Sequence, residues 1–488
     1  MLFNSIPFVF FFAVVTTLYF LLPHRFRWFL LPAASCFFYM FFKPVYILIL
    51  AFTIVIDYYA GILLEDTPDK KQKKKYLIMS IIANVGVLAV FKYFNFLNTN
   101  ISGLALMMGY KNPIPFLSIA LPIGLSFHTF QAMSYTIEVY RGNHKAERHF
   151  GIYSLYVMFY PQLVAGPIER PQNMLHQFHE EKFFNYNNAV AGLRLMVWGM
   201  FKKAVIADRL AMVTDPVFNN PHSYSATSIL IAAVFFSFEI YCDFSGYSDI
   251  AIDSARFMGF NLMKNFDQPY NAKSISEFWR RWHISLSTWF KDYLYIPLGG
   301  NRVSKPRRLS NLFLVFLVSG LWHGANWTYI IWGALHGFYM VFADLTTKIR
   351  STINKAIGLS RIKWLDQCIQ KLITFLLVTI AWIFFRANTV HDAVYMIGRL
   401  PSVFGEWAQA AQSKIAAVNI PLSGYKLWMC VIVIGALELV HIIQKRRGIN
   451  TLLQNQPRYI RWCVYYVFVV AIIFLGVFHN RQFIYFQF

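Results

Sequence analysis

The feature that most constrains this chain is a series of long segments without charged residues. The segment Pro7–Leu22 contains no Lys, Arg, Asp or Glu, and Val45–Leu64 is interrupted by Asp57 alone. A helix needs roughly 20 mostly apolar residues to cross a bilayer. Only 14% of the residues are charged, against about a quarter in soluble globular chains. The sequence therefore predicts an all-α polytopic membrane protein with about 10–12 transmembrane or re-entrant helices.

The basic residues gather in the loops between these segments and give a formal net charge of +22. His24, Arg25 and Arg27 follow the first apolar segment, and a lysine run at 70–75 follows the third. Because Lys and Arg are retained on the cytoplasmic side, we expect the N-terminus to be extracytoplasmic. The charge indicates contact with anionic lipid headgroups, and no nucleic-acid partner is predicted.

The chain shows no repeat and no loop long enough to bury a core of its own. We therefore expect a single domain over residues 1–488. The five cysteines are scattered, without the spacing of a disulfide framework or of a structural zinc site. The sequence predicts no metal site. It also contains no Walker loop, GxGxxG or GxSxG motif, which argues against ATP hydrolysis and a soluble serine esterase.

Two segments depart from the pattern of simple helical hairpins. The uncharged segment Leu309–Ala343 is much longer than one span requires and carries Gly320, Gly324, Gly333 and Gly337. It predicts a long, tilted or broken helix. In Asn112–Ile137, Pro115 and Pro122 interrupt an apolar run, which predicts a kinked or re-entrant segment. Both segments suggest an internal cavity.

The segment Phe278–Tyr295 has the periodicity of an amphipathic helix with an aromatic face. Its apolar residues recur at three- and four-residue steps, and the cations Arg280, Arg281 and Lys291 lie largely off that face. Such a helix can lie along the membrane interface, with its rings at headgroup level. A plain interfacial anchor is an equally good interpretation.

His323 is the strongest candidate for chemistry. It lies inside the uncharged segment, within SGLWHGANW, where a polar side chain is costly. Gly320 and Gly324 form a small-xxx-small step that lets another helix approach closely and leaves room for a substrate. A neutral imidazole can accept a proton near pH 7. From the residues alone, a general base and a histidine that bridges two helices by hydrogen bonds stay equally open.

Three further histidines lie in apolar surroundings. His283, in RRWHISLS, has neighbouring cations that would oppose its protonation and keep it neutral as a base or a donor. It could also merely face headgroups. His128 and His336 lie in apolar segments, where a packing role is more typical than a catalytic one.

An acidic and aromatic segment, EIYCDFSGYSDIAID, contains Glu239, Asp243, Asp249 and Asp253. Their spacing places them on broadly neighbouring faces of a helix. A cation or proton path is one interpretation. Structural pairing with Arg256, or with an Arg or Lys of another helix, is the interpretation that we favour.

Several segments together resemble the membrane-bound O-acyltransferase family, in its alginate O-acetyltransferase branch. The resemblance runs nearly end to end. The matching segments are LPIGLSFHTFQAMSYTIEVYRG (121–142), YPQLVAGPIERP (160–171), IYCDFSGYSDIAI (240–252), FWRRWHISLSTWFKDYLYIPLGGNR (278–302), SGLWHGANWTYIIWGALHG (319–337) and FIYFQF (483–488).

The resemblance implies that His323 is the family's essential histidine and His283 its second motif histidine. It implies a catalytic tunnel through the membrane, in which an acyl group from a cytoplasmic thioester meets an acceptor from the other side. The implied donor is acetyl-CoA, a substrate rather than a bound cofactor. The implied partner is a periplasmic or surface esterase-like protein that acetylates a polysaccharide, and the implied location is the bacterial inner membrane.

Chemistry at a thioester carbonyl also needs groups that stabilise an oxyanion and position the substrates. Trp322, Asn326 and Tyr295 are candidate donors, and Asp292 is a further positioning candidate. Arg280 and Arg281 could meet the phosphates of CoA if their face is cytoplasmic. They could equally bind lipid.

We therefore expect a membrane O-acetyltransferase that acts towards an extracytoplasmic polysaccharide such as alginate, with His323 as base and His283 as its partner. Peptidoglycan and cellulose stay open as acceptors. A membrane transporter using the acidic segment is a rival, but a transporter commonly repeats such groups in both halves, and this chain shows no such symmetry. A scaffold for a polysaccharide export complex would leave His323 dispensable.

Overall fold

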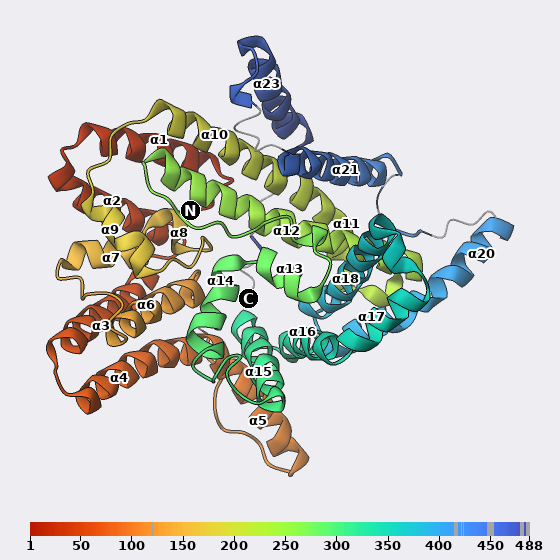
Figure 1. Cartoon of the computed structure of the whole chain (residues 1–488), viewed down its shortest axis with the longest axis horizontal. Helices are drawn as coiled ribbons and strands as arrows, with labels where there is room; N and C mark the ends of the chain where they lie inside the picture. Colours follow the sequence, from red (N-terminus) through yellow and green to blue (C-terminus); the bar gives the residue numbers. More distant parts are fainter. Residues whose placement is uncertain are drawn as a thin grey trace. The chain divides into compact units, whose positions relative to one another are not determined.

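The computed structural model describes residues 1–118, 122–413, 418–420, 422, 424–446, 453–478 and 483–484. Within these ranges the regular structure is entirely helical, with short π-helical and 3₁₀-helical segments and no strand (Figure 1). The predicted all-α fold is confirmed. Leu121 and the last four residues of the motif FIYFQF lie outside the described residues.

Six of the described helices are long and apolar enough to cross a membrane. They are Tyr46–Asp66, Lys70–Met107, Ala226–Phe257, Lys363–Arg386, Gly424–Lys445 and Arg458–Leu475. A seventh, Ile6–Leu21, is apolar but shorter. These helices confirm a polytopic membrane protein. The count of about 10–12 crossing or re-entrant segments stays a prediction, because it includes shorter and more polar helices.

The described chain forms two compact units. The first comprises Met1–Val197 and Tyr247–Lys264, and the second comprises Trp198–Gly246 and Asn265–Phe488. The expectation of one domain over residues 1–488 stays a prediction. The first unit contains α1 (Ile6–Leu21), α2 (His24–Met40), α3 (Tyr46–Asp66), α4 (Lys70–Leu88), η1 (Ala89–Tyr93), α5 (Phe94–Met107), α6 (Leu125–Tyr140), α7 (Phe150–Met158), α8 (Tyr160–Leu163), α9 (Pro171–His179) and most of α10 (Tyr186–Met200).

The second unit begins within α10 and contains both strong candidate histidines. Its elements are η2 (Phe201–Ala207), α11 (Asp208–Asn219), η3 (Pro221–Ser223), the larger part of α12 (Ala226–Phe257), η4 (Pro269–Asn271), α13 (Ile275–Arg281), α14 (Ile284–Phe290), η5 (Lys291–Tyr295), α15 (Lys305–His323), α16 (Trp327–Leu345), α17 (Thr347–Ala356), η6 (Leu359–Arg361), α18 (Lys363–Arg386), α19 (Val390–Arg399), η7 (Leu400–Ser402), α20 (Val403–Ser413), α21 (Gly424–Arg446) and α23 (Arg458–Leu475).

Asp57, the one charged residue of its apolar segment, is buried in the first unit beside donors from α4. Ser80 Oγ donates to Asp57 Oδ1 at 2.6 Å, and Asn84 Nδ2 donates to Oδ2 at 2.8 Å. A carboxyl group without such donors would be costly to bury. Because Ser80 and Asn84 lie one turn apart on α4, their pairing with Asp57 fixes how α3 and α4 are aligned.

The described residues between α5 and α6, 108–118 and 122–124, are not helical, as the prolines predict. Asparagine side chains of α5 bind several of their backbone groups. Asn95 Oδ1 accepts the Leu117 N–H at 2.9 Å, and Asn95 Nδ2 donates to the Leu117 carbonyl at 2.9 Å. Irregular backbone is tolerated at membrane depth only where protein or water satisfies it, and here α5 supplies those partners. Gly124, in the left-handed conformation at φ 78°, then begins α6.

The uncharged segment Leu309–Ala343 is broken into α15 and α16, which lie against each other (Figure 1). α15 ends at His323, and Asn326 caps α16 by accepting the Thr328 N–H at 3.1 Å. Gly320 and Gly333 form the closest approach: a Cβ on Gly333 would lie 3.0 Å from Gly320 Cα and closer still to the Phe316 carbonyl oxygen. The predicted break and the predicted close approach at glycine are both confirmed.

We expect Gly333→Ala to destabilise the protein by about 1–3 kcal/mol, because the added Cβ would press on helix backbone that cannot rotate away. The measurement is the Tm of the purified protein in detergent. Gly435→Ala in α21 is the matched control, since a Cβ there meets nothing within 4 Å and Ala favours a helix over Gly. A Gly333→Ala protein as stable as this control would contradict the close approach.

Candidate active site

His323 lies at the carboxyl end of α15 inside an aromatic enclosure in the second unit. Its side chain is buried. The imidazole centroid lies 4.9 Å from the ring of Trp322, 4.9 Å from Trp332 on α16 and 5.4 Å from Phe385 on α18. The glycine contact between α15 and α16 sets this position, because it brings the first turns of α16 against the last turn of α15. The enclosure leaves little of the imidazole exposed to solvent.

Residues 278–295 do not form the single interfacial helix that their aromatic periodicity predicts. α13 ends at Arg281 and α14 begins at Ile284, and His283 between them is in the left-handed conformation, with φ 44° and ψ 55°. The break turns the aromatic residues into the core, so the prediction of a headgroup anchor is wrong. The buried members of that stripe are Trp279, Trp282, Leu286, Trp289 and Phe290.

Asn265 holds His283 through its side chain. Its Oδ1 accepts from His283 Nδ1 at 3.1 Å, from Ser285 Oγ at 2.9 Å and from the Ser285 N–H at 3.3 Å. A backbone N–H can only donate, so the shared acceptor is the amide oxygen, and Nδ1 of His283 carries the proton. Nε2 is therefore the basic nitrogen of His283.

The backbone of Asn265 also supports the unusual conformation of His283. The Asn265 carbonyl accepts the Ile284 N–H at 2.9 Å. Among the described non-glycine residues, only His283 and Gln268 have a positive φ. Such a conformation costs of order 1–3 kcal/mol and persists where the surrounding structure enforces it. The position and orientation of His283 are therefore imposed by the Asn265 loop.

Burial keeps His283 neutral. It lowers the pKa of His283 from 6.5 to about 3, so the imidazole is uncharged at physiological pH. From the sequence we expect neighbouring cations to keep His283 neutral, and that reason is wrong, because burial is the cause. Arg281 is paired with Glu277 at 2.8 Å, and Arg280 is exposed, with its Nη1 donating to Ser276 Oγ at 3.2 Å. Contact of these two arginines with CoA phosphates stays a prediction.

Trp322 joins the two predicted histidines into one cluster. The centroid of its ring lies 4.9 Å from that of His323 and 6.3 Å from that of His283. Phe244 of α12 packs edge-on against His283 at 4.7 Å, and Phe483 packs on Phe244 at 5.6 Å. The structure thus brings together His283, Trp322 and His323, with the first residue of the motif FIYFQF beside them.

The other positioning candidates have local structural partners. Asn326 caps α16 and donates from Nδ2 to the Asn388 carbonyl at 3.4 Å. The Tyr295 hydroxyl donates to Asn301 Oδ1 at 2.8 Å, and Asp292 lies half-buried in the same π-helical turn, η5. Their roles in positioning a substrate stay predictions.

Two carboxylates of the acidic segment, Asp243 and Asp253, form ion pairs. Asp243 Oδ1 lies 2.6 Å from Lys203 Nζ, which also binds Asp208 at 2.8 Å. In the first unit, Asp253 binds Arg256 at 2.9 Å. Glu239 accepts a hydrogen bond from Thr214 Oγ1. The structural pairing predicted as the alternative to a cation path is confirmed for Asp243 and Asp253.

His336 and His128 lie elsewhere in the helical core. His336 Nδ1 accepts from Trp279 Nε1 at 3.2 Å, and its ring packs on Trp332 at 5.0 Å. His128 is buried in α6 of the first unit. A packing role accounts for the surroundings of His336.

Sequence reasoning missed Asn265 and Ser285, the partners of His283. Ser285 lies two residues from His283 in the motif WHISLS, and a side-chain acceptor shared by both could have been suspected there. Asn265 has no such signal, because it lies in an irregular loop after α12 and reaches His283 only in the folded unit.

His283 and His323, two buried histidines that share Trp322, are suited to proton transfer away from bulk water, as the catalytic groups of an enzyme are. Residues 45–385 match the membrane-bound O-acyltransferase (MBOAT) family. The chain belongs to this family and is an O-acyltransferase.

Several proteins resemble the chain, two of the three described here over most of its length. It is 39% identical over 427 residues to the alginate O-acetylase AlgI of Pseudomonas syringae pv. tomato, covering 87% of this chain and 79% of the relative. It is 37% identical over 433 residues to the peptidoglycan O-acetyltransferase of Helicobacter pylori, covering 81% and 79%. A teichoic acid D-alanyltransferase of Streptococcus thermophilus is 31% identical over 253 residues, covering 48% and 59%.

The Asn265 contact predicts a pH effect. In Asn265→Asp, a carboxylate beside His283 Nδ1 would favour the imidazolium and raise the pKa of His283. A raised pKa leaves more of the His283 imidazole protonated at low pH. We therefore expect the activity of Asn265→Asp to fall as the pH is lowered from about 8 to 5. Titration of His283 should not affect the wild-type activity over this range. The measurement is acyl transfer against pH in membranes. Asn261→Asp in the same loop is the control, and superimposable Asn265→Asp and wild-type profiles would contradict the proposed contact.

Proposed function

We propose that the protein transfers an acetyl group from a cytoplasmic thioester, acetyl-CoA, towards an extracytoplasmic polysaccharide such as alginate. The observation that carries the proposal is His323, which lies buried at the turn of a glycine-packed hairpin and shares Trp322 with the neutral His283. The relatives named for O-acetylation of alginate and peptidoglycan support acetyl as the transferred group.

The chemistry requires a base and a dry site. The acceptor hydroxyl gives its proton to His323 as its oxygen attacks the thioester carbonyl. The new C–O bond replaces the C–S bond, and the proton passes to the departing thiolate of CoA. The aromatic walls formed by Trp322, Trp332 and Phe385 exclude water, which would otherwise hydrolyse the thioester.

His283 acts as the positioning partner. Because Asn265 holds the proton on Nδ1, Nε2 can accept a hydrogen bond from a hydroxyl or thiol that enters the site. Such a contact would orient the acceptor or the donor beside His323, where alignment of the reacting atoms lowers the barrier. A catalytic tunnel that admits the two substrates from opposite faces completes the proposal.

The acetyl group would leave through an exported partner. We propose a periplasmic or surface esterase-like protein that receives the acetyl group and modifies the polysaccharide. The protein would lie in the bacterial inner membrane with its N-terminus extracytoplasmic, because that orientation keeps the lysine run at 70–75 in the cytoplasm. On the donor side, the exposed Arg280 is available for the anionic phosphates of CoA.

Peptidoglycan is the second candidate acceptor, on the strength of the Helicobacter pylori relative; cellulose would use the same chemistry. The transport alternative loses support, because Asp243 and Asp253, two of the four carboxylates that suggested a cation path, are paired with cations. Disruption of the gene distinguishes the acceptors. We expect the O-acetyl content of the exported polysaccharide to fall while that of peptidoglycan is unchanged. Loss from peptidoglycan alone would reassign the acceptor.

We expect His323→Ala to abolish O-acetylation of the exported polymer while the protein still inserts into the membrane. Loss of a general base costs roughly 10²–10⁴-fold in rate. The measurements are transfer of label from radiolabelled acetyl-CoA by isolated membranes and the O-acetyl content of the polymer. Size-exclusion chromatography reports correct folding.

His323→Gln is the companion variant, because it retains a polar side chain of similar size without a basic nitrogen. Both variants should be inactive if the base is what matters. Wild-type acetylation in either folded variant would overturn the assignment of His323 as the base.

A further inference from the structure

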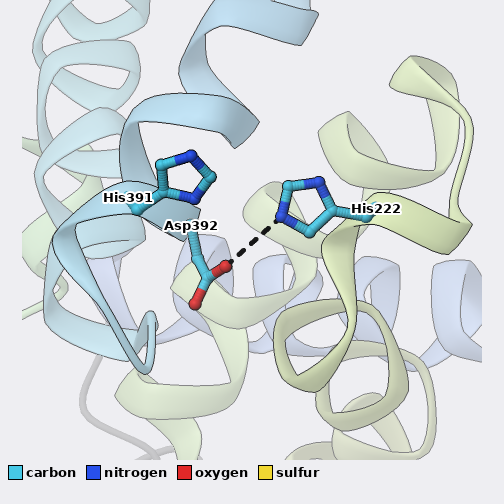
Figure 2. A group of neighbouring side chains, drawn as sticks. All are labelled: His222, His391 and Asp392. Atoms are coloured by element: carbon cyan, nitrogen blue, oxygen red, sulfur yellow. Dashed lines mark ion pairs between the residues drawn. The ribbon is translucent and has the colours of Figure 1, made fainter.

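Two histidines and an aspartate from segments far apart in the sequence converge in the second unit. His222 lies in η3, and His391 and Asp392 lie in the first turn of α19 (Figure 2). Their nitrogen and carboxylate oxygen atoms all lie within 4.8 Å of one another. His222 and His391 are exposed, and their ring centroids are 5.8 Å apart.

The distance between His222 and Asp392 is typical of two ligands of one metal ion rather than of a direct hydrogen bond. His222 Nε2 lies 3.6 Å from Asp392 Oδ1, which is longer than a hydrogen bond. In a tetrahedral zinc site, bonds of about 2.0–2.2 Å place neighbouring ligand atoms about 3.3–3.5 Å apart. The exposed side chain of His391 has room to rotate towards such a set, since its ligand atom already lies within 4.8 Å of the other two.

Hydrogen bonds with Thr389 orient the carboxylate of Asp392. Thr389 Oγ1 donates to Asp392 Oδ2 at 2.7 Å and accepts the Asp392 N–H at 3.0 Å. Oδ2 is thus occupied, and Oδ1 is the oxygen on the side of His222 (Figure 2). Tyr395 packs on the His222 ring with a centroid distance of 4.0 Å. Supporting contacts of this kind are typical of metal ligands, which need a fixed orientation.

We propose that His222, His391 and Asp392 bind a divalent transition-metal ion, of which Zn²⁺ is the best fit. Two imidazoles and one carboxylate are ligands that zinc accepts, whereas Ca²⁺ and Mg²⁺ take oxygen ligands. A water molecule would complete the tetrahedron. The site is separate from His283 and His323 and does not depend on the proposed function.

The ion would link η3 to α19, and the chain next to these two elements already makes contacts near the candidate active site. Arg386 at the end of α18 binds Asp215 of α11 at 2.8 Å. Asn388 receives the hydrogen bond from Asn326, which caps α16 directly after the turn that carries His323. A metal between η3 and α19 would therefore stabilise the segment around Asn388, whose carbonyl binds Asn326 at the start of α16. Its role is to stabilise the fold.

The test is zinc binding by the full-length protein, purified in detergent with a tag that contains no histidine and stripped with a chelator. We expect one Zn²⁺ per chain by calorimetry and a Tm that rises with Zn²⁺ but not with Mg²⁺. Co²⁺ should give the visible absorption of a tetrahedral site. His222→Ala and His391→Ala should each weaken binding by at least about 10-fold and remove the Tm shift.

His179→Ala is the matched control. His179 is also an exposed histidine beside a carboxylate, with Glu147 at 2.8 Å, but it belongs to no three-ligand group among the described residues. This variant should bind Zn²⁺ as the wild type does. Zinc binding that persists in both His222→Ala and His391→Ala would place the ion elsewhere and overturn the proposal. Failure of the wild type to bind Zn²⁺, or an equal response to Mg²⁺, would also overturn it.

Discussion

The close approach of α15 and α16 at Gly320 and Gly333 is the contact on which the arrangement of the site depends. With backbone against backbone, the two helices turn sharply within a few residues, and His323 is the last residue before that turn. The same approach brings Trp332 of α16 beside the imidazole. Larger residues at these glycines would separate the helices and open the aromatic enclosure. The position of the His323 imidazole therefore depends on the absence of side chains at Gly320 and Gly333.

A second constraint is that polar groups in a largely apolar protein need partners close at hand. Asp57 has donors on the next helix, and the irregular chain before α6 has asparagine partners on α5. Asp243 has Lys203. Each is satisfied by its own unit, as expected where water is scarce. His283 follows the same rule through Asn265, with the difference that Nδ1–H is committed and Nε2 remains the basic nitrogen.

The sequence was sufficient for the features that depend on local composition. The uncharged length of Leu309–Ala343 predicted a long, tilted or broken helix, of which the structure has the broken form, and its glycines predicted the close packing of helices that the structure shows at Gly320. The aromatic periodicity of residues 278–295 predicted a single interfacial helix, which is wrong. A helical period cannot reveal a left-handed residue such as His283 in the middle of the segment. Asn265 and the group of His222, His391 and Asp392 were beyond prediction, since their members meet only through the fold.

The left-handed backbone at His283 places a second requirement on the residue for which we propose a positioning role. That role needs an imidazole side chain, whereas the backbone conformation favours Gly, Asn or Asp. Replacement by alanine therefore changes strain and chemistry together, and the resulting loss cannot be assigned to either. Asparagine, a poor chemical substitute, is the better tolerated conformational one. At position 283, the amino acids that best replace the imidazole chemically are therefore not those that best tolerate the left-handed backbone.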